Sequence, residues 1–245
     1  MLGSFHALRP QDYPLPSPFE DAINQSERFL FEFDPHQDAQ FDELLKKAAC
    51  YPPGTNVKAK INPNTYAYLD KISKVPPKEW IGLKPWAIAT LVLRHPGYEK
   101  VRHYFGIEGY VQRRAAKHRG GFGGLETPAE HVRVLADMQD IESEVYLLQA
   151  LVYADQGPKE FEENVAAWKA GDVNRLYSIE SARMKEAPSI YWRLLDRRNA
   201  NWMPRIDAAI KAGKPTMIVV GALHFAGPHG LLAMLKGRGY QVEQL

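Results

Sequence analysis

The chain has 245 residues, of which 45% are hydrophobic, 11% aromatic and 24% charged, and these proportions exclude collagen-like, coiled-coil and disordered proteins. Its 31 basic and 29 acidic side chains give a formal net charge of +2, so we expect no overall field that recruits nucleic acid or an anionic membrane. The single cysteine, Cys50, excludes an intrachain disulfide and a zinc site built from several cysteines.

The first residues show no recognisable targeting signal. No apolar run approaches the roughly 20 residues that cross a bilayer, and no basic and apolar lead-in typical of a signal peptide precedes Gly3. The first strand-like segment, MLGSFHAL, begins abruptly at Met1, and we expect that a natural start lies upstream of it. The compartment is therefore left open, as is the oligomeric state.

The N-terminal segment predicts a β–loop–α–β unit. A short strand ends in Gly3-Ser4-Phe5-His6, and a proline-rich loop follows it. A helix with an apolar stripe over residues 19–23 leads to a second strand, residues 29–33, which ends at Asp34-Pro35.

The C-terminal segment repeats this order of elements. Residues 216–221 (TMIVVG) are almost wholly apolar and β-branched, which is typical of a strand buried on both faces of a parallel sheet. Gly221-Ala222-Leu223-His224 and a Gly/Pro loop follow, and then a short helix over residues 231–236 that glycines stop. Tyr240–Glu243 predicts a further strand. Two such units predict an α/β fold with a mostly parallel central sheet and right-handed crossovers.

Between the two units, residues 39–211 predict a large, mostly helical insertion within one domain of residues 1–245. Three stretches keep apolar residues at helical spacing: 41–49, 66–72 and 86–93. Residues 106–118 predict a helix with a basic face, and residues 122–126 predict at most a short strand.

Thr127 begins the clearest helix of the insertion. Pro128 follows it, and Glu130 stands three residues after it, which is the pattern of a capping box. Helices then continue to about Lys211, with breaks near residues 157–158, 171–172 and 187–188 and a new turn or kink at Pro204.

His6 and His224 are the first candidates for chemistry. Each ends a GxxH segment at the predicted carboxyl end of a parallel strand, where ligands of α/β sheets bind. Imidazole binds divalent transition metals and acts as a general base near neutral pH. Either histidine alone reads equally as a loop residue beside a helix start, but the matched positions favour a shared site.

Glu32 is the third candidate, because it lies in an apolar strand that we expect beside the strand bearing His6. A buried carboxylate there needs a cation, and a metal ion or an arginine would supply it. The alternative is a strand-end carboxylate that reaches solvent or caps a helix. His6, His224 and Glu32 together form a ligand set suited to zinc, manganese, cobalt or iron.

Arg198 is the fourth candidate, on a helix where Trp202, four residues later, can stack on its guanidinium. Such an arginine stabilises a developing oxyanion or binds a substrate carboxylate. A solvated ion pair with Asp196 is the alternative. Glu126, just before the capped helix, is a further candidate for the same crevice.

Other features are weaker. The glycine-rich residues 118–124 lack the Gly-Lys-Ser/Thr of a phosphate-binding loop, and the basic residues 113–119 lack the interleaved aromatics of a nucleic-acid site. No GxSxG marks a serine nucleophile. The remaining histidines show no metal-ligand spacing: His36, His95, His103, His131 and His229.

The chain resembles the TraB/GumN family over nearly its whole length. The resemblance is carried, in order, by LGSFHAL (2–8), FLFEFD (29–34), GLETPAEH (124–131), DRRNANW (196–202) and VVGALHFAGPHGLLAMLKGRGYQVE (219–243). The family groups with the Tiki proteins and is related to erythromycin esterase and ChaN-like proteins. Two departures are the short strand before the first GxxH and Glu108 where relatives often carry aspartate.

The resemblance implies an α/β fold with paired GxxH motifs. Tiki proteins are known as metal-dependent proteases that favour manganese or cobalt, and the TraB/PrgY branch blocks peptide pheromone signalling. Carried over, this implies His6 and His224 as metal or catalytic histidines, Glu32 as the strand carboxylate and Arg198 as the arginine of the family's motif. Together with the residues considered above, we expect His6, His224 and Glu32 to bind a divalent ion (Mn, Co or Zn), Glu32 also to act as a base, and Arg198 and Glu126 to be catalytic. The expected substrate is a peptide or a small molecule.

Three functions remain open at this stage. The first is a metal-dependent hydrolase of amide bonds, in which replacing Arg198 by alanine is expected to lower kcat by roughly 10²–10³ with folding intact. The second is metal-free, esterase-like chemistry with His6 as base, Glu32 orienting it and His224 assisting. The third is a non-catalytic protein that binds a peptide or haem.

Overall fold

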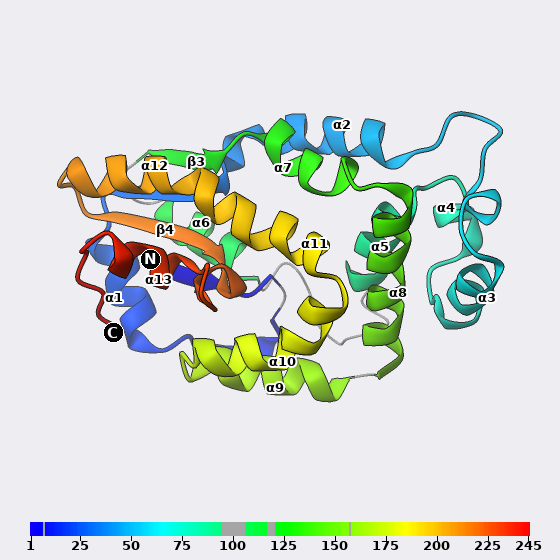
Figure 1. Cartoon of the computed structure of the whole chain (residues 1–245). Coiled ribbons are helices and arrows are strands. Elements are labelled where there is room, and N and C mark those ends of the chain that lie inside the picture. The colour runs from blue at the N-terminus through cyan, green and yellow to red at the C-terminus, as the bar shows by residue number, and fades with distance from the viewer. Residues whose placement is uncertain (7, 95–105, 117–120, 157) are drawn as a thin grey trace.

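A four-stranded, all-parallel sheet forms one end of the molecule in the computed structural model, which describes residues 1–6, 8–94, 106–116, 121–156 and 158–245 (Figure 1). The strand order is β1-β4-β2-β3. The strands are β1 (Leu2–Ser4), β2 (Arg28–Phe33), β3 (Phe122–Glu126) and β4 (Thr216–Gly221). The predicted α/β class and parallel sheet are confirmed.

The strand order differs from the expected one. β4 pairs with β1 on one side and with β2 on the other, so Glu32 lies beside β4 and not beside the strand that precedes His6. The apolar, β-branched sequence of β4 suits this central position, since a central strand is buried on both faces. The short strand at residues 122–126 is the edge strand β3, which interrupts the helical middle segment.

Alternate residues of the strands pack into two cores, as a period of two requires. Phe29, Phe31 and Val219 face the helices α1 (Ser17–Gln25), α6 (Ile107–Ala115) and α9 (Pro158–Lys169). Leu30, Ile218 and Val220 face α12 (Arg197–Lys211) and α13 (Leu231–Gly237). The sheet is therefore the middle layer of three, with helices on both faces.

The predicted strand at Tyr240–Glu243 is wrong, because the chain after α13 forms no strand. Tyr240 and Val242 instead pack their side chains against the core beneath α12 and α13. Their apolar character thus reflects a covering segment and not a sheet position.

The remaining helices build a second, helical part beside the sheet (Figure 1). They are α2 (Asp38–Ala49), α3 (Pro63–Ile72), α4 (Pro77–Trp80), α5 (Pro85–Arg94), α7 (Pro128–Ala136), α8 (Asp140–Gln156), α10 (Val173–Glu186) and α11 (Pro188–Tyr191). Short 3₁₀ turns lie at Pro10–Asp12, Pro35–Gln37, Val57–Ala59 and Ala222–Phe225 (η6). Among the described residues, no helix combines the length and apolar character that crossing a bilayer requires.

The helix boundaries follow the sequence signals closely. Breaks fall at residues 171–172 and at Ala187, as predicted, but Pro204 lies inside α12 without ending it. The break near residue 157 and the end of the basic helix at residue 118 fall on residues outside those described, although α6 itself ends at Ala115.

Candidate active site

The candidate residues gather at the edge of the sheet where the parallel strands end. His6 follows β1, Glu32 lies near the end of β2, Glu126 is the last residue of β3, and His224 lies in the turn after β4. Arg198 reaches the same edge from the first turn of α12. This is the side of an open α/β sheet on which ligands bind.

Arg198 is the central cation of the site. Its Nη2 donates to Glu32 Oε2 and to Glu126 Oε1, both at 2.5 Å, and its Nε donates to Glu126 Oε2 at 3.2 Å. Trp202 stacks beneath the guanidinium, 4.6 Å from Cζ to the ring centroid, as the spacing predicts. Burial disfavours the charge, but the two carboxylates outweigh it and raise the pKa of Arg198.

A π-helical turn, Trp192–Asp196, immediately precedes α12, of which Arg198 is the second residue. The carbonyl oxygen of Leu194 in this turn accepts a hydrogen bond of 3.3 Å from Arg198 Nη1. Single π-turns within helices frequently accompany functional sites. Here the turn supplies a backbone acceptor that orients the guanidinium, whose ion pairs are with Glu32 and Glu126 rather than with Asp196.

Glu32 is held from two sides. Its Oε1 accepts a hydrogen bond of 2.9 Å from the backbone N–H of Gly221, and its Oε2 accepts from Arg198. Burial opposes ionisation, but Arg198 and then His224 outweigh it and hold the pKa of Glu32 well below its ordinary value. Glu32 is therefore a carboxylate, paired with an arginine as one of the two predicted possibilities.

His224 is buried, with 3% of its surface exposed. Its Nδ1 lies 2.7 Å from Asn199 Oδ1, and its Nε2 lies 3.3 Å from Arg198 Nη1 and 3.9 Å from Glu32 Oε1. Burial and the neighbouring guanidinium lower the pKa of His224 to about 3. The ring is consequently neutral near pH 7, with a nitrogen directed at Glu32 and Arg198.

His6 lies on the solvent side of the site, with 68% of its side chain exposed. Its Nδ1 is 2.6 Å from Glu108 Oε1, which also accepts a hydrogen bond of 2.6 Å from Ser4 Oγ. Burial raises the pKa of Glu108, but His6 and Ser4 outweigh it and the net shift is downward. Glu108, and not Glu32, is therefore the carboxylate that orients His6.

The two histidines and Glu32 meet beside Gly221. A Cβ added to this glycine would lie 3.5 Å from Glu32 Oε1, 3.5 Å from His224 Cδ2 and 3.9 Å from His6 Nε2. The three groups therefore surround one small space that only a residue without a side chain leaves open. This is the neighbourhood that the paired GxxH segments predict.

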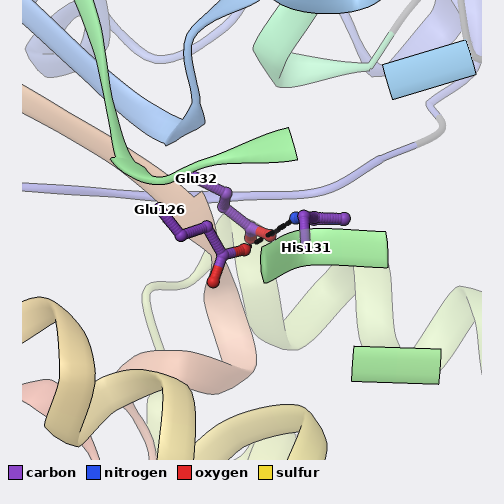
Figure 2. Close-up of side chains that lie close together, drawn as sticks. All are labelled: Glu32, Glu126 and His131. Atoms are coloured by element: carbon purple, nitrogen blue, oxygen red, sulfur yellow. Dashed lines mark hydrogen bonds and ion pairs between the residues drawn. The ribbon is translucent and has the colours of Figure 1, made fainter. Parts of the chain in front are cut away.

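Glu126 lies deeper, and His131 joins it (Figure 2). Glu126 Oε1 is 2.7 Å from His131 Nδ1, and Glu126 Oε2 accepts a hydrogen bond of 3.0 Å from Trp202 Nε1. Burial opposes ionisation of Glu126, yet His131 and Arg198 outweigh it and lower its pKa. Its contacts make Glu126 an anchor for Arg198 and Trp202.

His131 is a residue that the metal-ligand spacing did not mark. It lies in the first turn of α7, whose start at Thr127 has the predicted capping box, with Glu130 N donating to Thr127 Oγ1 and Thr127 N to Glu130 Oε2. A helix that begins where β3 ends places its first turn at the site. Glu108 was also missed as a site residue, because it comes from α6 and no local pattern links α6 to β1.

Two sets of side chains have the donor atoms that a divalent ion needs. Glu32, Glu126 and His131 each offer an atom within 4.8 Å of the others, but Arg198 Nη2 already lies 2.5 Å from both carboxylates and 3.2 Å from His131 Nδ1. A guanidinium thus supplies the positive charge in this set. A metal ion would have to displace it.

The second set is the one that the sequence predicts, His6, Glu32 and His224, although among the described residues only the first set brings three such donor atoms within 4.8 Å of one another. Both histidines have Nδ1 held by an orienting group, Glu108 or Asn199, and metal-bound imidazoles typically have their other ring nitrogen held in this way. The neutral His224 and the ionised Glu32 are in the protonation states that ligation requires. The donor set therefore matches zinc, manganese or cobalt.

Acidic side chains outnumber the arginine at this edge of the sheet. Three carboxylates with lowered pKa values, Glu32, Glu108 and Glu126, lie near Arg198, which pairs with two of them. The imidazoles of His6 and His131 lie against Glu108 and Glu126.

Comparisons with known proteins give one family. The model of the TraB/PrgY/gumN family matches residues 1–244. Neither the comparison with curated proteins nor that with solved structures finds a match.

Proposed function

We propose, from the premise that the chain belongs to the TraB/PrgY/gumN family over residues 1–244, that it is a metal-dependent hydrolase of amide bonds in peptides. In this proposal His6, His224 and Glu32 hold the divalent ion. One observation carries it: two oriented imidazoles and an ionised carboxylate surround the space beside Gly221. The resemblance to metal-dependent proteases supports the reaction class.

A divalent ion at this place supplies Lewis acidity and makes water nucleophilic near neutral pH. The chain's own residues supply the rest. Glu32 is ionised, and when it leaves the ion by ligand exchange it can accept the proton of the attacking water through Oε1. Glu108 holds the ring of His6 through Nδ1 and leaves Nε2 as its ligand atom, and the proton that Glu32 accepts from water is the one that passes to the departing amine.

Arg198 provides positive charge that needs no reorganisation during the reaction. Its Nε and Nη2 donate to carboxylates, whereas Nη1 makes two long contacts of 3.3 Å within the described part of the chain, to Leu194 O and His224 Nε2. Nη1 is thus the donor available to a developing oxyanion. Glu126 acts through Arg198 in this scheme, by fixing its plane.

Metal removal and replacement test the proposal. The purified protein is stripped with a chelator and supplied with Mn²⁺, Co²⁺ or Zn²⁺ singly, and cleavage of a defined peptide mixture is followed by mass spectrometry. We expect cleavage to disappear on stripping and to return with at least one ion. The variant His6→Ala/His224→Ala is expected to lose bound metal, whereas His36→Ala, whose imidazole contacts Asp34 outside the ligand set, keeps it.

A metal-free hydrolase is the second candidate, and the short contact between His6 Nδ1 and Glu108 favours it, since a carboxylate-oriented histidine is a general base. Cleavage that survives exhaustive chelation would select this function. Tight binding of a peptide with no product over long incubation would instead select a binding protein.

A further inference from the structure

We propose that Asn199 is a positioning residue that fixes the ring of His224 in the tautomer protonated on Nδ1, so that the Nε2 lone pair faces the site. The tautomer itself follows from hydrogen bonds alone. Its use in ion binding rests on the function proposed above.

Both polar atoms of the Asn199 side-chain amide make hydrogen bonds to one loop. The residue is 1% exposed, and its Nδ2 donates to the backbone oxygens of His224 and His229, both at 3.1 Å. Its Oδ1 lies 2.7 Å from His224 Nδ1. A single side chain on α12 therefore ties both ends of the loop from His224 to His229 and also one ring nitrogen.

These contacts determine the position of the ring proton. Backbone oxygens only accept hydrogen bonds, so the NH₂ group of Asn199 must face them and Oδ1 must face the ring. Oδ1 also only accepts, so Nδ1 of His224 must carry the proton. The opposite tautomer would bring two acceptors together at 2.7 Å in a buried place.

The other ring nitrogen gives the same answer independently. His224 Nε2 lies 3.3 Å from Nη1 of Arg198, and a guanidinium has donors but no acceptor. Nε2 must therefore accept. The indole of Trp202 packs on the imidazole at 4.5 Å between centroids, and the lone pair lies on the side of the ring that faces Arg198 and Glu32. An ion bound to Nε2 would take the place of the hydrogen bond from Arg198.

The wild-type protein provides the first test. His224 is assigned by comparison with His224→Gln in protein labelled with ¹⁵N-histidine, and long-range ¹H–¹⁵N correlation at pH 7 without metal reads the tautomer. We expect Nδ1–H only. Nε2–H, or a mixture of both tautomers, overturns the proposal, and this measurement requires neither activity nor a variant at Asn199.

Variants at Asn199 provide the second test. Asn199→Ala removes the acceptor, so we expect mixed tautomers and a loss of roughly 10–100-fold in affinity for the active ion. Asn199→Asp keeps an acceptor for Nδ1–H and should retain the wild-type tautomer. Asn201→Ala, an exposed neighbour on α12, is the matched control and should change neither readout.

The outcomes separate the two proposals. A wild-type tautomer that persists in Asn199→Ala shows that Asn199 does not set it. A wild-type protein that has only Nδ1–H but binds none of the three ions contradicts the metal-dependent function and leaves the role of Asn199 standing.

Discussion

Glu32 accepts a hydrogen bond of 2.9 Å from the backbone N–H of Gly221, so the carboxylate of β2 is fixed against the end of β4. The same glycine opens the space that His6, Glu32 and His224 surround. One position thus anchors Glu32 through its backbone and, in the proposed function, makes room for an ion through its missing side chain.

Gly221→Ala is expected to fold normally and to lose function. The backbone there, φ −49° and ψ 137°, is allowed for alanine, and the new methyl would make ordinary contacts of 3.5 to 3.9 Å. It would nevertheless fill the space beside the three ligands. Thermal unfolding should show no loss of Tm, while metal content and peptide cleavage should fall to the level of His6→Ala/His224→Ala; a variant that cleaves at the wild-type rate would refute this placement of the ion.

Gly3→Ala, unlike Gly221→Ala, should lower the stability of the fold. Its Cβ would lie 3.1 Å from Ala222 Cα and 3.2 Å from Ala222 Cβ, where β1 packs closely on the turn after β4. We expect a loss of about 1–3 kcal/mol in the free energy of unfolding, measured in urea. Equal unfolding free energies of Gly3→Ala and wild type would mean that the turn after β4 shifts at little cost.

Arg198→Ala is expected to lower stability as well as rate, which changes the outcome predicted from sequence. The substitution leaves Glu32 and Glu126 buried without their shared cation, and breaking such a pair typically costs about 3–5 kcal/mol. Urea unfolding measures this cost, and kcat should fall by roughly 10²–10³ where the variant folds.

Arg197→Ala is the control for this experiment, because Arg197 is exposed and stacks on the exposed Trp192. Its unfolding free energy should stay within about 0.5 kcal/mol of wild type. Arg198→Lys keeps the charge but not the paired N–H donors, so it should recover part of the stability and little of the rate. Full activity in Arg198→Lys would show that the reaction does not require a planar guanidinium.

Glu108→Gln should weaken the site through His6. The amide can still accept a hydrogen bond from His6 Nδ1 or Ser4 Oγ but no longer carries the charge that makes the imidazole a stronger ligand. We expect a loss of about 10-fold or more in ion affinity, measured by titration with Mn²⁺ and Zn²⁺. Unchanged affinity would show that His6 binds no ion.

Because of the lowered pKa of Asp12, which lies away from the site, we expect the stability of the fold to fall in acid. Burial raises its pKa, but hydrogen bonds from Arg9 and Lys169 outweigh this and lower the pKa to about 2, below the ordinary 3.8. The stabilisation is complete above pH 3.8 and is lost as the pH falls toward 2, because the unfolded chain takes up the proton first.

Asp12→Asn should therefore be about 1–2 kcal/mol less stable than wild type at pH 6, and the difference should shrink between pH 4 and pH 2. Urea unfolding across this range measures it. A difference that does not change with pH would show that the ion pairs of Asp12 contribute no charge-dependent stability.

Local signals in the sequence predicted the parts of this molecule that depend on neighbouring residues. The apolar run of β4, the capping box at Thr127 and the stacking of Trp202 on Arg198 all follow from spacing within a few residues. The position of β4 between β1 and β2 does not, because it depends on which strands pair across some 200 residues of sequence.

The same distinction explains the residues that were missed. Glu108 meets His6 from a separate helix, and His131 meets Glu126 only because β3 lies at the edge next to β2. Tyr240 and Val242 alternate with polar residues as strand residues do. Their side chains nevertheless pack on the core beneath α12 and α13, and their segment pairs with no strand. Apolar pattern alone does not distinguish these partners.

The place of β4 also has a consequence for biosynthesis. β1 and β2 each form hydrogen bonds to β4, which ends at Gly221. The two strands that are synthesised first therefore cannot join one sheet until the ribosome has translated and released β4. Until then the nascent polypeptide holds apolar strands without their shared neighbour, and chaperones are the natural protection for such a state. Premature termination before that residue would leave β1 and β2 without the strand that joins them.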